Sequence, residues 1–476
     1  MAAMPQMEAL SEEEREIDAI VARARAAQAR FEEGADQARY DRAALAAAWA
    51  VMEPARNREL AELAVRTTGL GNVADKITKN HRKTLGLLRD IKEARTCGVI
   101  AEDAANGLTE IARPIGVIGA IVPSTNPVAT PLNNIVNALK CGNAIVLSPS
   151  PKGVEACARL LEHVYAEFDK AGIDRDLVQM APAPSSKAKT QRIMEVTDLL
   201  VVTGSQDNVR RAYSSGTPAI GVGAGNVTVI VDESADPADA AAKIARSKMF
   251  DNATSCSSEN AVIVVDAVYD AFVAALQAED GAVLAQGSDR TVAERLWPDG
   301  HLNRAVLAQD APKMLAALDL TDSVPTGTRF VAVPTDGVGP AYPLSGEKLS
   351  LVMALYRVSD FDAAVEKARS ILTFQGAGHS IGLHSGIDRR ALDLAHTLPT
   401  CRVIVNQAHC FATGGSFDNG MPFSLSMGCG SWGGNSIDDN LNWRHFMNTT
   451  KVVRTIPPRE PALDDIFGHY WDEVGR

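Results

Sequence analysis

The order of apolar and polar positions predicts a helical amino-terminal region. Ser11 and Glu14 have the spacing of a capping box, and apolar residues then recur at helical spacing from Ile17 to Ala24. Similar patterns cover 43–52 and 59–65, and glycines at 69 and 71 mark a break. Helices this rich in alanine are typical of a layer that covers another element.

After an irregular stretch at 96–114, short apolar runs alternate with helical patterns. Strands are predicted at 115–123, 143–147, 178–181 and 198–203. Helices are predicted between them at 133–140, at 154–168 and around Gln191. This alternation indicates βαβ units and a parallel sheet, so the first half is a candidate for a doubly wound nucleotide-binding fold.

The same alternation restarts in the second half and predicts a second α/β domain. Its strands are expected at 227–231, 261–265, 350–356, 380–384 and 402–406. Its helices are expected at 236–250, 268–276 and 360–370. The segment 413–435 is rich in Gly and Ser with interleaved apolar residues, which indicates an ordered loop. The run 449–456 predicts a terminal strand without a partner in its neighbourhood, which indicates pairing with another subunit.

Composition narrows the class of protein. The chain has 476 residues, of which 46% are hydrophobic and 22% charged, which excludes a disordered protein. A net charge of −12 argues against sequence-independent binding to nucleic acid or to an anionic membrane. No apolar run is long enough to span a bilayer, so we expect a soluble protein. Seven scattered cysteines without a C-x-x-C pair indicate a reducing cytoplasm and no metal site.

Cys256 is the cysteine whose surroundings suit a nucleophile. It lies among small polar residues in the segment FDNATSCSSEN, between a predicted helix and a predicted strand. Reactive thiols occupy polar, partly open surroundings that favour the thiolate. The alternative is a small buried hydrophobic residue, as for the other six cysteines.

Three further segments each allow a functional and a structural interpretation. Asn126, in PSTNP after a strand, could donate to an oxyanion or could only close a turn. Gly204 and Ser205 follow a strand and begin a helix, where backbone N–H groups could receive a pyrophosphate or Ser205 could simply cap the helix. The segment GVGAGN (221–226) precedes a strand, so a loop crossing between domains fits it better than a phosphate cradle.

Taken together, these segments resemble the CoA-acylating branch of the aldehyde dehydrogenase superfamily. The correspondence runs in order through RPIGVIGAIVPSTNP, NAIVLSPSPK, VTGS, GVGAGN, FDNATSCSSEN, EKLSLVMALYRVSDFDAAVEKA and GCGSWGGNS. The resemblance implies two doubly wound Rossmann-like domains plus a small oligomerisation arm. It assigns 1–95, 114–221 and 430–448 to a nucleotide-binding domain, 222–429 to a catalytic domain, and 96–113 with 449–476 to the arm. It also implies a homodimer or homotetramer.

The same resemblance assigns roles to individual residues. Cys256 falls at the position of the thiol that attacks the aldehyde carbonyl, and Asn126 at that of an oxyanion donor, partnered by the Cys256 backbone N–H. Glu347, in SGEKLS, falls at the position of a glutamate that holds the nicotinamide ribose, the alternative being a surface carboxylate. The implied cofactor-binding residues are Ser148, Pro149, Ser150, Lys152, Gly204, Ser205, Gly221, Gly223 and Glu347.

Two departures from hydrolytic aldehyde dehydrogenases bear on the reaction. Gly221 stands where those enzymes keep a glutamate as the general base for water, so a thioester on Cys256 would persist until the thiol of coenzyme A removes it. The run 148–151 (SPSP) replaces a K-P-x-E pattern that binds the adenosine ribose, which leaves NAD and NADP equally open. The sequence therefore predicts reversible conversion of an aldehyde, CoA and NAD(P)⁺ to acyl-CoA and NAD(P)H.

The substrate side is predicted to be polar. Thr254, Ser255, Ser257 and Ser258 surround Cys256, and Asn133 and Asn134 lie on the helix after Asn126. Such groups suit a charged or polar substituent, and the pattern is similar to that of acylating sulfoacetaldehyde dehydrogenases. Acetaldehyde and succinate semialdehyde are the alternative substrates. A hydrolytic aldehyde dehydrogenase, an acyl-phosphate reductase of the same fold and a catalytically silent homologue are the alternative functions.

Overall fold

The computed structural model describes residues 10–476 and begins with a layer of four helices. The helices are α1 (Glu12–Glu32), α2 (Gln37–Met52), α3 (Pro54–Thr68) and α4 (Val73–Ile91). The Ser11 capping box is present, and the predicted apolar stripe of α1 is buried. Asn72 caps α4 by accepting a hydrogen bond from the Asp75 N–H.

The first half contains a parallel sheet of five strands in the order β5-β4-β3-β6-β7. Its strands are β3 (Val117–Val122), β4 (Ala144–Pro149), β5 (Val178–Met180), β6 (Leu199–Val202) and β7 (Ala219–Gly221). Its helices are α5 (Ala129–Lys140), α6 (Val154–Ala171), α7 (Lys187–Val196) and α8 (Gln206–Tyr213). Strands β3 and β4 are buried along their whole length, as expected when helices cover both faces.

The second half contains a parallel sheet of seven strands in the order β10-β11-β12-β9-β8-β13-β14. Its strands are β8 (Val227–Val231), β9 (Glu259–Val265), β10 (Gly281–Val283), β11 (Phe330–Pro334), β12 (Val352–Val358), β13 (Ile381–His384) and β14 (Val403–Val405). Its helices are α9 (Pro237–Met249), α10 (Asp266–Ala278), α11 (Asp289–Leu296), α12 (Ala311–Ala317), α13 (Phe361–Phe374), α14 (Arg389–Thr397) and α15 (His409–Ala412).

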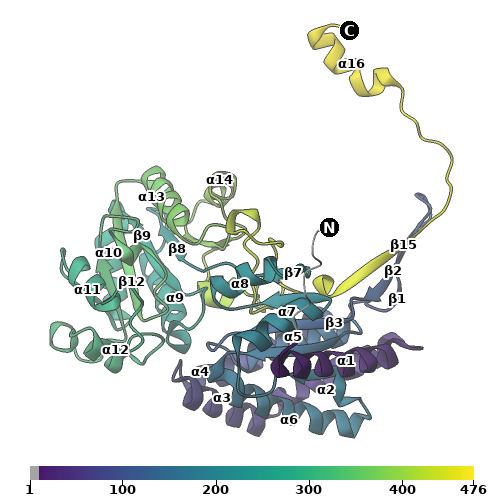
Figure 1. Ribbon diagram of the computed structural model, residues 1–476. Coiled ribbons are helices and arrows are strands. Elements are labelled where there is room, and N and C mark those ends of the chain that lie inside the picture. The colour runs from purple at the N-terminus through teal and green to yellow at the C-terminus, as the bar shows by residue number, and fades with distance from the viewer. Residues whose placement is uncertain (1–9) are drawn as a thin grey trace, which may run out of the picture.

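These two sheets form two lobes that lie side by side (Figure 1). Each lobe has its own cluster of buried apolar residues. The residues 222–226 lead from β7 in one sheet to β8 in the other, as expected for a crossing loop. The parallel α/β fold predicted from the sequence is therefore confirmed. The domain boundaries stay a prediction.

A third, antiparallel sheet extends from the first lobe and corrects two expectations. The stretch 96–114, predicted to be irregular, forms β1 (Gly98–Asp103) and β2 (Leu108–Pro114). Strand β15 (Met447–Val453) pairs with β2, so the expectation that it lacks a partner nearby was wrong. Its partner precedes it by more than 300 residues, which sequence proximity could not reveal. Beyond β15, an extended segment leads to α16 (Leu463–Val474), which stands apart from both lobes (Figure 1).

Across residues 10–476, no helix combines the length and apolarity needed to cross a bilayer.

Candidate active site

A cavity of about 870 Å³ collects most of the predicted site residues. Residues that follow β3, β4 and β6 line it from the first lobe, and the segments around Cys256 and Glu347 line it from the second. The predicted residues that line it are Cys256, Asn126, Ser148, Pro149, Ser150, Gly204, Ser205, Gly223 and Glu347. Lys152 is exposed and lies outside this lining, and so does Gly221.

A left-handed turn holds Cys256 in the cavity. Asp251, Asn252 and Ala253 have φ angles of 50°, 52° and 59°, a conformation that costs most residues about 1–2 kcal/mol each. Asp and Asn tolerate it better than most residues because their short side chains bond locally. Asn252 Nδ2 donates to Asp310 Oδ1 at 2.8 Å, and the Asp251 N–H donates to Asp75 Oδ2 at 2.8 Å. The turn is thus fastened to its surroundings before the chain reaches Cys256.

The Asp251 carboxylate is the buried anchor of this turn. Its Oδ2 accepts hydrogen bonds from Lys76 Nζ at 3.1 Å, Lys79 Nζ at 2.5 Å and Thr254 Oγ1 at 2.7 Å. Burial alone would raise the pKa of Asp251, but the two ammonium groups outweigh burial and hold it below its ordinary value. The anchor is therefore an ionised carboxylate between two buried cations of α4.

Lys79 also orients the candidate oxyanion donor. Its Nζ donates to Asn126 Oδ1 at 3.0 Å and to Thr254 Oγ1 at 2.9 Å. With its oxygen engaged, the Asn126 amide offers its N–H groups for donation into the cavity that it lines. The Cys256 backbone N–H makes no hydrogen bond to another residue within 10–476. Two residues of the cavity lining thus have N–H groups without a partner in another residue of 10–476, as an oxyanion hole requires.

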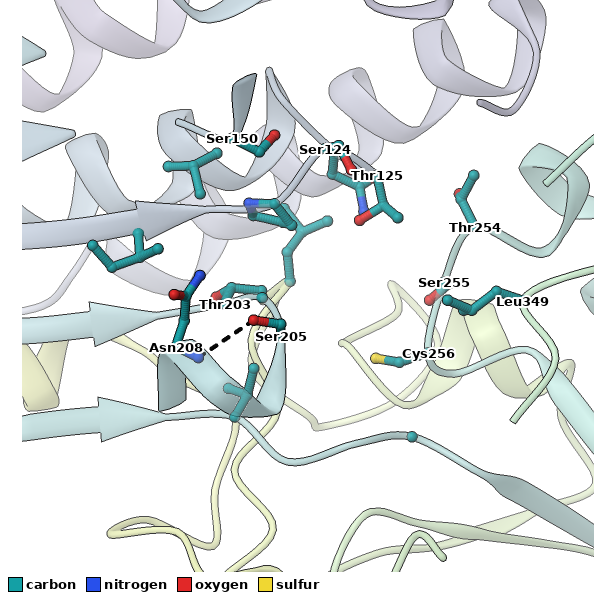
Figure 2. A pocket seen from close by; sticks show the side chains of 18 of the residues that line it. Ser124, Thr125, Ser150, Thr203, Ser205, Asn208, Thr254, Ser255, Cys256 and Leu349 are labelled. Atoms are coloured by element: carbon teal, nitrogen blue, oxygen red, sulfur yellow. Dashed lines mark hydrogen bonds between the residues drawn. The ribbon is translucent and has the colours of Figure 1, made fainter. Parts of the chain in front are cut away.

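The protonation state of Cys256 differs from the sequence expectation. Burial, followed by the nearby Glu347 and Cys429, raises the pKa of the Cys256 thiol to about 12. The sequence predicted a polar, partly open setting that favours the thiolate; Cys256 is partly exposed in the cavity, but the apolar surroundings of the sulfur act against its ionisation. Figure 2 shows the Cys256 side chain pointing into the cavity, across from Thr203 and Ser205.

Two glycines of the segment 221–226 shape the site by lacking side chains. A Cβ atom on Gly225 would lie 2.3 Å from the Cys256 carbonyl oxygen, so only glycine allows this close approach. A Cβ atom on Gly221 would lie 2.6 Å from Val209 Cγ1 and 3.2 Å from the Tyr213 ring. Tyr213 further fixes Gly221, because its hydroxyl accepts the Gly221 N–H at 3.1 Å. Position 221 therefore has no room for a carboxylate side chain in this arrangement.

Glu347 lines the cavity and is not a surface carboxylate. Burial raises its pKa to about 8, although Lys348 and Lys248 act in the opposite direction. This raised pKa favours the protonated form of the side chain over the carboxylate near neutral pH. Asp207 is the other carboxylate residue that lines the cavity, and none of the residues that line it within 10–476 is a histidine.

The end of the cavity near β4 and α8 offers groups that fit a dinucleotide. Ser150 Oγ is buried and has no hydrogen-bond partner within the described chain. Ser148 Oγ lies 3.0 Å from Thr190 Oγ1. Ser205 caps α8, and its Oγ accepts the Asn208 N–H at 3.3 Å (Figure 2). Capping and anion binding are compatible, since the first N–H groups of the helix still face the cavity.

The polar residues expected beside the substrate are only partly where the sequence indicates. Thr254, Ser255 and Ser257 line the cavity, whereas Ser258 does not. Asn133 and Asn134 are buried within α5, away from the cavity lining, so they do not face a substrate there. Helix α5 packs against both α2 and α4, and this tertiary contact decides which way the side chains point.

Sequence reasoning missed three basic residues of the lining: Lys79, Arg82 and Lys83, all on α4. Their spacing of three and four residues places them on one face of the helix, which the sequence does contain as a signal. A basic helix face usually meets solvent, however, and nothing nearby in the sequence indicates that this one meets Cys256.

Comparison with known proteins identifies the family. The sequence profile described as "Aldehyde dehydrogenase family" matches residues 5–292, more than half of the chain. The chain belongs to the aldehyde dehydrogenase family. A family member named sulfoacetaldehyde dehydrogenase (acylating), from Cupriavidus necator, is 57% identical over 97% of this chain and 93% of its own length. Another of the same name, from Bilophila wadsworthia, is 39% identical over 92% of this chain and 95% of its own length.

Solved structures of the family agree with this fold. An acetylating aldehyde dehydrogenase from Geobacillus thermoglucosidasius superposes with a TM-score of 0.90 at 32% identity, covering 95% of this chain and 99% of that one. The aldehyde dehydrogenase fold therefore extends over nearly the whole chain.

Proposed function

We propose that this aldehyde dehydrogenase is CoA-acylating: it oxidises an aldehyde with NAD(P)⁺ and transfers the acyl group from Cys256 to coenzyme A. The observation that carries the proposal is that the position expected for a base that activates water is a glycine. Gly221 is packed by Val209 and Tyr213, and burial raises the pKa of Glu347 to about 8, which favours its protonated form. An acyl thioester on Cys256 therefore awaits a nucleophile that ionises more readily than water, which a thiol does.

The residues of this chain have defined parts in that reaction. Cys256 Sγ attacks the aldehyde carbonyl carbon while the thiol proton passes to solvent, and the oxygen of that carbonyl becomes an oxyanion. Asn126 Nδ2 and the Cys256 N–H donate to that oxyanion, and Lys79 keeps the Asn126 amide turned toward it. A nicotinamide cofactor supplies the hydride acceptor, and Ser148, Ser150, Gly204 and Ser205 are the residues that would hold it. Transfer to CoA exchanges one thioester for another, so the reaction is reversible.

Sulfoacetaldehyde is the proposed substrate. Its use is supported by the two relatives that carry that name, one of them 57% identical, and by the hydroxyl groups of Thr254, Ser255 and Ser257 in the cavity lining. Such groups match a polar substituent better than a methyl group. Acetaldehyde lacks the sulfonate, so comparing the two aldehydes as substrates tests whether the enzyme prefers the sulfonate.

The arm belongs to the proposal as an oligomerisation element. Strand β15 has no strand on its outer edge within 10–476, and α16 exposes Leu463, Ile466, Phe467, Tyr470 and Val474. These features support a homodimer or homotetramer assembled through 96–113 and 449–476. The remaining proposed boundaries lie at 221/222, where the chain leaves β7 for β8, and at 429/430, between β14 and β15.

The test is to follow reduced nicotinamide by absorbance, with sulfoacetaldehyde and NAD⁺ or NADP⁺, in the presence and absence of CoA. We expect sustained turnover with CoA and at most one equivalent per active site without it. Cys256→Ala removes both signals. Steady turnover at similar rates without CoA would show a hydrolytic enzyme.

A further inference from the structure

The cavity contains positive charge that the proposed chemistry does not use. The chain as a whole has a net charge of −12, yet Lys79, Arg82 and Lys83 of α4 all line this one cavity. Lys79 is occupied by Asp251, Thr254 and Asn126. Within 10–476, neither Arg82 nor Lys83 has a carboxylate oxygen within 4.0 Å.

Lys83 is a buried amino group without a carboxylate partner within residues 10–476. Its side chain is only 9% exposed, and its Nζ donates to the Gly414 carbonyl oxygen at 2.5 Å. An ammonium group has three N–H donors, so two remain for a ligand. Burial, with Arg82 next in effect, lowers its pKa to about 7. An unpaired buried cation is unfavourable in a folded protein unless something else compensates it, and an anionic ligand would.

Arg82 is positioned by an aromatic ring rather than by an acid. Its guanidinium lies 4.8 Å from the centre of the Phe411 ring, and Nη2 donates to Ser416 Oγ at 3.4 Å. Stacking on a ring fixes the plane of the guanidinium while leaving its N–H groups unpaired. Asp418 acts on Arg82 only through its charge at longer range, and the Arg246 guanidinium lies 4.6 Å from the centre of the same Phe411 ring.

The location of these cations fits a small substrate. Lys79 contacts both Asn126 and Thr254, so this face of α4 borders the reacting centre. Lys83 follows Lys79 by one helical turn, a rise of ~6 Å. Lys83 and Cys256 both line this cavity. A ligand held by Arg82 and Lys83 would thus have its other end beside Cys256.

We propose that Arg82 and Lys83 form the subsite that binds the sulfonate of the substrate, and so select an anionic aldehyde over an uncharged one. The proposal rests on the proposed function, because it concerns the same cavity and the same reaction. A sulfonate offers three acceptor oxygens and stays ionised at any physiological pH, which matches the unused donors of an ammonium and a guanidinium.

The experiment compares kcat/KM for sulfoacetaldehyde and acetaldehyde, with CoA saturating, in the wild-type enzyme and in Arg82→Met and Lys83→Met. The control is Lys92→Met, since Lys92 lies at the exposed end of the same helix. We expect each cavity variant to lower the ratio of the two constants by about ten- to a hundredfold, mainly through KM for sulfoacetaldehyde. Lys92→Met leaves the ratio as in the wild type.

A second measurement covers the case in which a variant folds poorly. Ethanesulfonate, which carries the sulfonate without the aldehyde, should inhibit the wild-type enzyme competitively against acetaldehyde, and the conservative variant Lys83→Arg should retain this inhibition. The proposed subsite would be contradicted if the ratio of kcat/KM for sulfoacetaldehyde to that for acetaldehyde were unchanged in both cavity variants. It would also be contradicted if the variants raised only the KM for CoA. Absence of CoA-dependent turnover with either aldehyde in the wild type would instead contradict the proposed function itself.

Discussion

The thiol of Cys256 is protonated in the free enzyme at neutral pH, and its reactivity should reveal this. With a pKa of about 12, the thiolate fraction, and hence the alkylation rate by iodoacetamide, rises about tenfold per pH unit up to and beyond pH 9. Peptide mass spectrometry measures the alkylation of Cys256. The variant Cys256→Ala shows how much of the total alkylation comes from the other cysteines. A plateau below pH 8 would mean that the thiol has a depressed pKa.

Asn126 and Lys79 should act as one unit in stabilising the oxyanion. Asn126→Ala is expected to lower kcat by about 10²–10³, the range for loss of one oxyanion donor. Lys79→Met leaves the Asn126 amide without its hydrogen-bond partner and is expected to lower kcat by a smaller factor.

A double-mutant cycle separates this positioning role from general damage. The variant that combines Asn126→Ala with Lys79→Met should be no slower than Asn126→Ala alone, because Lys79 acts through the amide. Multiplicative losses would assign Lys79 an independent role, such as support of the turn around Asp251.

At the scale of single elements, the left-handed turn at 251–253 depends on a buried carboxylate. Asp251→Asn leaves Lys76 and Lys79 without an ionised partner and should lower the free energy of unfolding by about 3–5 kcal/mol. The control is Glu294→Gln, which breaks an exposed ion pair with Arg290 and should change the free energy of unfolding by no more than ~0.5 kcal/mol. Thermal and urea unfolding of the two variants measure the contrast, and equal effects would show that the Asp251 cluster is not an anchor.

The strands that could be predicted from the sequence are those that are buried on both faces. Strands such as β3, β4 and β8 are buried on both faces, so an unbroken apolar run identifies them. The exposed hairpin of β1 and β2 was missed because its positions are mostly solvent-facing and include acidic residues. In such a strand, neither an apolar run nor alternation is available as a signal.

The residues of the candidate site also fall into two groups: those that the sequence indicates and those that only the fold brings together. Cys256 and Asn126 stand in short local motifs, so their sequence neighbours indicate them. Lys79 lies 172 residues from Asp251, and its role exists only because folding brings α4 against the turn before Cys256. The raised pKa of Cys256 could not be predicted for a related reason: neighbouring hydroxyls are visible in the sequence, whereas the effect of distant residues such as Glu347 and Cys429 is not.

At the scale of the whole molecule, the arm should determine the oligomeric state. Deletion of 454–476 removes α16 with its exposed apolar side chains and the segment that follows β15. We expect mass photometry to show a homodimer or homotetramer for the full chain and a smaller species for the shortened chain. A monomer in both cases would contradict oligomerisation through this arm.

Residues of both lobes line one cavity, in which we propose that an acyl group on Cys256 resists hydrolysis. The most direct test of this proposal is the lifetime of the acyl group on Cys256, followed by intact-protein mass spectrometry after a single oxidation with NAD(P)⁺ and sulfoacetaldehyde. At pH 7 the adduct should persist without CoA, and should disappear within one turnover when CoA is added, as acyl-CoA forms. Rapid loss of the adduct without CoA, with release of the free carboxylic acid, would contradict the account.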